Sequence, residues 1–143
     1  AFSVVAIVYN RTGSEQMSAL AGLGRRAPLL SGCMALFMVS LVGLPPLAGF
    51  AAKYQLFYAL FSFEGYDLRW LVAIALLNTL ISLFYYTRVI RAMFLETSDL
   101  PPIAVSPAAQ AWVVALAVPV TFLLIVWNPL TQAADYFCAK LLG

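Results

Sequence analysis

The sequence contains no histidine among its 143 residues, and only 10% of them are charged. Without histidine the chain lacks the commonest metal ligand and the commonest general base, so proton chemistry falls to lysine, carboxylates, tyrosine or water. Cys33 and Cys138 stand far apart in apolar surroundings, where the default interpretation is a small buried hydrophobe. The net charge is +2 and no basic run alternates with aromatics, which argues against nucleic acid as a partner. No metal site and no set of catalytic residues is predicted.

Apolar residues take the place of charge: 64% of the chain is hydrophobic and the mean hydropathy is +0.93. Soluble domains are nearer half apolar and a quarter charged, so the sequence indicates an all-α transmembrane protein embedded in a lipid bilayer. The expected segments are a helix tail at 1–9, a cytoplasmic loop with a short interfacial helix at 10–28, a broken transmembrane helix at 29–63, and transmembrane helices at 70–95 and 111–130.

The first ten residues, AFSVVAIVYN, have neither the basic start nor the cleavage site of a signal peptide. A span of about nine residues cannot cross a hydrocarbon core that needs roughly twenty. We therefore expect a fragment of a longer protein, with further helices of the same subunit upstream. Thr12 and Glu15 have the spacing of a capping box, which predicts the start of the short interfacial helix.

The stretch 29–63 is too long for one simple span and too short for two. It is either a single pass broken in the middle or a re-entrant hairpin. The two alternatives place the basic residues differently on the two sides of the membrane. With a single pass, one side has Arg11, Arg25, Arg26, Arg88 and Arg91, and the other has Arg69 and Lys140. With a hairpin, one side has Arg11, Arg25, Arg26, Arg69 and Lys140, and the other has Arg88 and Arg91. Both counts are five against two, so the positive-inside rule leaves the alternatives open.

The break itself is the stretch GLPPLAGFAAKYQLF, residues 43–57. Pro45 and Pro46 lack a backbone N–H, so the carbonyls before them lose their helical partners. Unpaired backbone at membrane depth requires packed protein or internal water. Gly43 and Gly49 allow the chain to bend and neighbouring backbone to approach.

Lys53 follows the break, about one and a half turns into a second half-helix that should begin near Leu47. A charged lysine at the bilayer centre costs about 3 kcal/mol on insertion scales, so such residues usually face a bundle interior and mark a transport pathway. Desolvation and the positive dipole end of the second half-helix both disfavour the ammonium, which favours a lysine that gains and loses a proton. The alternative is a side chain that snorkels to an interface.

A polar stripe lies on the next span, where Asn78, Ser82 and Tyr85 occupy one helical face. This stripe is expected to line internal water or to hydrogen-bond to Lys53. Ordinary interhelical hydrogen bonding is the alternative.

The segments SLVGLPPLAGFAAKYQLF and LNTLISLFYYTRVIRAMF closely resemble the C-terminal region of subunit N of respiratory complex I, the NADH:quinone oxidoreductase. AGLGRRAPLL resembles the same family's segment before the broken helix. The resemblance implies an antiporter-like fold with inverted repeats, each with one discontinuous helix, and a stretch 29–63 that crosses once. It also implies that Lys53 is the terminal proton-channel lysine.

The function that this resemblance implies is proton translocation coupled to NADH oxidation by quinone, in a subunit that is not itself catalytic. NADH, FMN, iron–sulfur clusters and quinone would bind partner subunits, and this chain would hold no cofactor. Its partners would be neighbouring membrane-arm subunits, in a bacterial inner membrane rather than a mitochondrial or thylakoid one. The alternatives are a structural subunit without a proton path, or a component of a multi-subunit cation/proton antiporter or membrane-bound hydrogenase.

Overall fold

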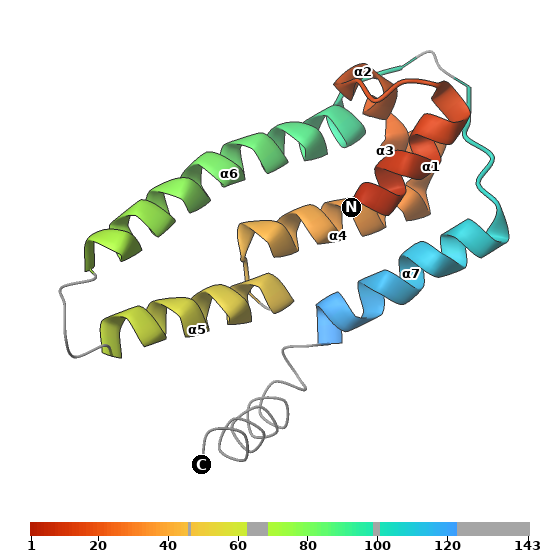
Figure 1. Cartoon of the computed structure of the whole chain (residues 1–143). Helices are drawn as coiled ribbons and strands as arrows, with labels where there is room; N and C mark the ends of the chain where they lie inside the picture. Colours follow the sequence, from red (N-terminus) through yellow and green to blue (C-terminus); the bar gives the residue numbers. More distant parts are fainter. Residues whose placement is uncertain (46, 63–68, 99–100, 123–143) are drawn as a thin grey trace.

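The computed structural model describes residues 1–45, 47–62, 69–98 and 101–122 (Figure 1). These residues form helices and connecting turns with no strand among them, so the predicted all-α class is confirmed. The helices are α1 (Phe2–Thr12), α2 (Met17–Leu20), α3 (Leu23–Arg26), α4 (Pro28–Val42), α5 (Ala48–Ser62), α6 (Arg69–Leu95) and α7 (Pro107–Phe122).

Helix α4 begins at Pro28, whose fixed φ suits the first helical position and whose missing N–H removes no helical bond. It ends at Gly43, which adopts a left-handed conformation with φ of 87°. The Gly43 N–H donates to the Ser40 carbonyl at 2.9 Å, and the Leu44 N–H to the Val39 carbonyl at 3.4 Å. This pair of bonds is a Schellman motif. The first half of the broken helix therefore stops at a glycine cap, before the prolines are reached.

The chain continues in the same direction after this break instead of turning back. In Figure 1, α4 (orange) and α5 (yellow) run in the same direction, with α5 displaced sideways from the α4 axis. Pro45 lies in the connecting turn and prevents α4 from continuing, whereas Pro46 falls outside the described residues. The hairpin alternative, which charge counting left open, is therefore wrong.

Helix α6 returns antiparallel to the broken helix, and α7 then runs parallel to α4 (Figure 1). Within the described residues, Trp70–Leu95 is the one helix long and apolar enough to cross a bilayer unaided, while Pro28–Val42 and Pro107–Phe122 are shorter apolar helices. Of the expected span 111–130, the part from 123 onward lies outside the described residues.

The core lies at the end of the molecule where α1, α3 and the first turns of α4 meet α6 and α7 (Figure 1). Its members are large apolar side chains with almost no exposed surface, namely Val4, Val8, Leu23, Leu30, Met34, Met93 and Val113. Cys33 is a half-buried free thiol packed against this cluster. Arg11, Arg25 and Arg26 lie at this end, with Arg88 and Arg91 in the last two turns of α6, which is the charge grouping expected for a single pass.

The segment 10–28 differs from the expected capped helix. Thr12 is the last residue of α1, and its hydroxyl donates to the Val8 carbonyl at 2.9 Å. Gly13 then ends α1 in a left-handed conformation, and α2 begins without a side-chain cap. The capping box is absent because α1 continues through Thr12, which uses its hydroxyl within its own helix.

Arg26 ties this segment to the connector between α6 and α7. Its side chain is 9% exposed; Nε donates to the Pro101 carbonyl at 3.0 Å and Nη1 to the Ala19 carbonyl at 3.1 Å. The Arg26 carbonyl in turn accepts from the Ile103 N–H at 3.4 Å. The Arg26 guanidinium thus joins three segments of the chain. It donates to the Ala19 and Pro101 carbonyls, which no helical N–H satisfies.

Replacing Arg26 with methionine should therefore lower the free energy of unfolding by about 3 kcal/mol, since two charge-assisted hydrogen bonds are lost. The change is measured as a fall in the thermal denaturation midpoint of the detergent-solubilised protein. Arg25→Met is the matched control, because the neighbouring Arg25 is exposed and loses the same charge. Equal shifts for both variants would contradict a specific role of Arg26.

Candidate functional site

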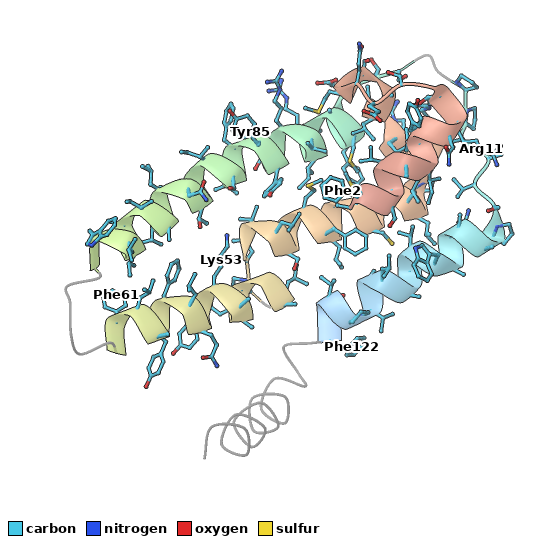
Figure 2. The ribbon with its side chains drawn as sticks, in the orientation of Figure 1. Phe2, Arg11, Lys53, Phe61, Tyr85 and Phe122 are labelled. Carbon is cyan, nitrogen blue, oxygen red and sulfur yellow. The ribbon has the colours of Figure 1, made fainter. Side chains whose placement is uncertain are left out.

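The candidate site is the ammonium group of Lys53, held at the break by groups from two other helices. Lys53 is half-buried on the first turns of α5. Its Nζ donates to the Val42 carbonyl at 2.7 Å and to Thr79 Oγ1 at 3.3 Å. Figure 2 shows the side chain in the space between the end of α4, α5 and α6. The lysine therefore points into the break, toward the end of α4 and toward α6.

Val42 supplies one of the carbonyls that the break leaves without a helical partner. It is the last residue of α4, where unsatisfied carbonyls give the helix a partial negative charge. The ammonium of Lys53 caps that end. The sequence indicated only the positive end of the second half-helix, now α5. In the folded chain the group nearest to Nζ is the negative end of α4, which attracts the ammonium.

Gly43 and Gly49 are required by close packing around the lysine. A Cβ added at Gly43 would lie 2.8 Å from Lys53 Cδ, so the aliphatic stem of the lysine packs directly on this glycine. A Cβ added at Gly49 would overlap the Ser40 carbonyl oxygen. The Gly49 N–H also donates to Ser40 Oγ at 3.2 Å. The two glycines thus let the half-helices approach until Lys53 reaches the end of α4.

Thr79 is a contact that sequence reasoning missed. Its hydroxyl donates to the Ala75 carbonyl at 2.9 Å, so its oxygen is free to accept from Lys53. The available signal was spacing: the inward face of α6 is formed by residues that are three and four apart, Val72, Ala75, Thr79, Ser82, Tyr86, Val89 and Met93. Small side chains in the middle of this face leave room for the lysine.

The predicted polar stripe does not converge on Lys53 as a unit. Asn78 and Tyr85 are exposed, and Tyr85 has 59% of its surface accessible. Ser82 lies on the inward face, but its hydroxyl donates to the Asn78 backbone carbonyl at 2.8 Å. Asn78 lines an apolar groove between α5 and α6 together with Leu56 and Ile74. The side chain of α6 that contacts the lysine is therefore Thr79, one position from the predicted residue.

A broken apolar helix with an ionisable side chain at the break is typical of ion sites in membrane transport proteins. The profile of the family described as NADH:quinone oxidoreductase/Mrp antiporter, transmembrane, matches residues 1–82. The chain belongs to this family.

Individual relatives agree with this assignment. The chain is 46% identical over 128 residues to NADH-quinone oxidoreductase subunit N 2 of Sorangium cellulosum, covering 88% of this chain and 25% of the relative. It is 40% identical over 139 residues to subunit N of an Anaeromyxobacter species, covering 92% and 27%. These matches confirm the resemblance to subunit N. The chain spans about a quarter of the length of these relatives.

The fold is also similar to a solved structure. A chain of respiratory complex I from Thermus thermophilus, determined with bound aureothin, superimposes with a TM-score of 0.67 at 34% sequence identity. The match covers 78% of this chain and 26% of that chain. The fold of most of this chain is thus shared with a chain of that complex.

Proposed function

We propose that this chain is the C-terminal part of a proton-translocating subunit in the membrane arm of an NADH:quinone oxidoreductase. The observation that carries the proposal is the position of Lys53, whose Nζ is held by the Val42 carbonyl at a break in an apolar helix. Ionisable residues inside membrane proteins usually mark ion or proton pathways, because their insertion into the bilayer is unfavourable.

The proposed chemistry is reversible protonation of Lys53. The ammonium gives a proton to water at the break and regains one from the other side when charges in neighbouring subunits change. The Val42 carbonyl and the negative end of α4 stabilise the charged state, and water replaces missing contacts at the break. Asn78, Ser82 and Tyr85 remain a proposal for lining that water, although only Ser82 lies on the inward face.

Electron transfer is assigned to other subunits in this proposal. NADH, FMN, iron–sulfur clusters and quinone would bind partner subunits, and the redox energy would reach this chain through the membrane arm. The location that fits is a bacterial inner membrane, because the relatives named above are bacterial. The remaining contacts of this chain would be lipid, neighbouring membrane-arm subunits and further helices of its own subunit.

A second candidate is a component of a multi-subunit cation/proton antiporter, because the matching family includes Mrp antiporters as well as the oxidoreductase. A related hydrogenase subunit, or a structural subunit without a proton path, is a weaker alternative. The similarity to subunit N at 46% identity favours the oxidoreductase.

Purification of the tagged full-length subunit in mild detergent separates these candidates. We expect flavin- and iron–sulfur-containing subunits to copurify, and the complex reconstituted in vesicles to move protons when NADH and quinone are added. Proton movement that requires a sodium gradient and proceeds without any redox subunit would instead identify an antiporter.

A further inference from the structure

Thr79 makes two hydrogen bonds. The bond to the Ala75 carbonyl is of a kind that other hydroxyl side chains of this chain also make, whereas the bond from Lys53 is not. Thr79, Ser82, Thr87 and Thr121 each donate to the carbonyl four residues earlier. This bond satisfies a hydroxyl in an apolar helix and needs no functional explanation. Of these four residues in the described part of the chain, Thr79 alone also accepts from a lysine, at 3.3 Å.

The direction of these bonds matters for the lysine. Because the single hydroxyl proton of Thr79 is used by the Ala75 carbonyl at 2.9 Å, the Thr79 oxygen acts toward Lys53 as an acceptor. The Val42 carbonyl is also only an acceptor. Lys53 Nζ therefore faces two fixed acceptors, one from α4 and one from α6.

The two bonds leave one direction at Lys53 Nζ unused. An ammonium has three N–H donors, of which two are used by Val42 and Thr79. Within the described residues no third acceptor is bonded to Nζ. The neutral amine keeps two N–H donors and gains one lone pair. Both bonds are therefore retained in either protonation state if the proton is exchanged in the third direction.

We propose that Thr79 is a positioning residue for proton exchange at Lys53. Together with the Val42 carbonyl it fixes two of the three directions at Nζ, so that the third faces the water that takes the proton. In this step one N–H bond breaks, its electron pair stays on nitrogen, and the proton passes to a water molecule. The inference rests on the proposed function and adds a residue to that same site.

Thr79→Val tests the inference, because valine keeps the branched shape and removes the hydroxyl. The variant is introduced into the full subunit of the assembled complex in membrane vesicles, and protons moved per NADH oxidised are measured. A charge-assisted hydrogen bond corresponds to about a tenfold or larger change in the equilibrium between a held and a released lysine. We expect the proton yield per NADH to fall clearly, with complex abundance unchanged.

Two further variants separate positioning from packing. Thr79→Ser restores an oxygen at the same position and should recover the yield. Thr87→Val removes an equivalent hydroxyl from the same helix, where it bonds only the Leu83 carbonyl at 2.6 Å, and should leave the yield unchanged. Equal losses in Thr79→Val and Thr87→Val, or no recovery with serine, would overturn the positioning role.

The same vesicles distinguish failure of this inference from failure of the proposed function. If Lys53→Met lowers the yield and Thr79→Val does not, Lys53 acts without help from Thr79 and only the inference is wrong. If neither variant changes the yield in a fully assembled complex, both the inference and the proposed proton path are wrong.

Discussion

Replacing Lys53 with methionine is expected to lower the number of protons moved per NADH oxidised, while the complex still assembles. Methionine matches the unbranched stem that packs on Gly43 but removes the ammonium that contacts the Val42 carbonyl. Without a group that gains and loses a proton at the break, water alone must carry protons past the end of α4. The measurement is proton uptake against NADH oxidation in membrane vesicles, with the amount of assembled complex determined in the same preparation.

The control for this variant is Gln55→Met on the same helix. Gln55 is exposed, so replacing it adds a methionine to α5 and leaves every side chain at the break unchanged. A normal proton yield in Gln55→Met and a reduced one in Lys53→Met would place the effect at the ammonium. A normal yield in both, with full assembly, would make Lys53 a packing feature and would reject the proposed proton path.

Gly49→Ala is expected to have the largest effect on folding. The new Cβ would overlap the carbonyl oxygen of Ser40, a backbone atom that cannot move aside as a flexible side chain would. Helices α4 and α5 would have to separate, which breaks the bond between the Gly49 N–H and Ser40 and withdraws Lys53 from Val42. Overpacking of this kind costs about 3 kcal/mol or more. The amount of assembled complex in membranes should fall several-fold.

Gly32→Ala gives the matched comparison, since it makes the same substitution in the second turn of α4. A Cβ at Gly32 meets nothing within 4 Å, and alanine is a better helix former by about 1 kcal/mol. Assembly should therefore be unchanged or improved. If Gly49→Ala assembled as well as Gly32→Ala, the close approach of the half-helices would not be needed for the fold.

The existence and place of the break were predictable because prolines and glycines in an apolar run have few other interpretations. Which atoms the break brings together was less predictable. Helix α4 ends at Gly43, whose left-handed conformation accompanies cap bonds to the Val39 and Ser40 carbonyls. A carbonyl such as Val42 carries no side-chain signal, so a sequence reveals that it loses its partner but not which donor replaces it.

Thr79 was missed for a related reason. Large apolar residues occur on every side of helix α6, so its pattern of hydropathy gives little indication of which face packs on the protein. The prediction for this helix was based on polar side chains and therefore included Asn78 and Tyr85, which are exposed in the structure. Side-chain size is the better guide in such a helix, because closely packed membrane helices place small residues at their contacts. Ala75, Thr79 and Ser82 satisfy that rule.

The position of Lys53 at the end of α4 also has an electrical consequence. Helix α4 has 15 residues and rises about 22 Å, against a hydrocarbon core of about 30 Å. In the proposed path, a proton that reaches Lys53 from the start of α4 would travel the length of this helix inside the insulating layer. Moving one charge across the whole layer involves about 2.3 kcal/mol per 100 mV. The membrane voltage would thus act on the proton transfers that load and unload Lys53, and so bias how often Lys53 is loaded from each side.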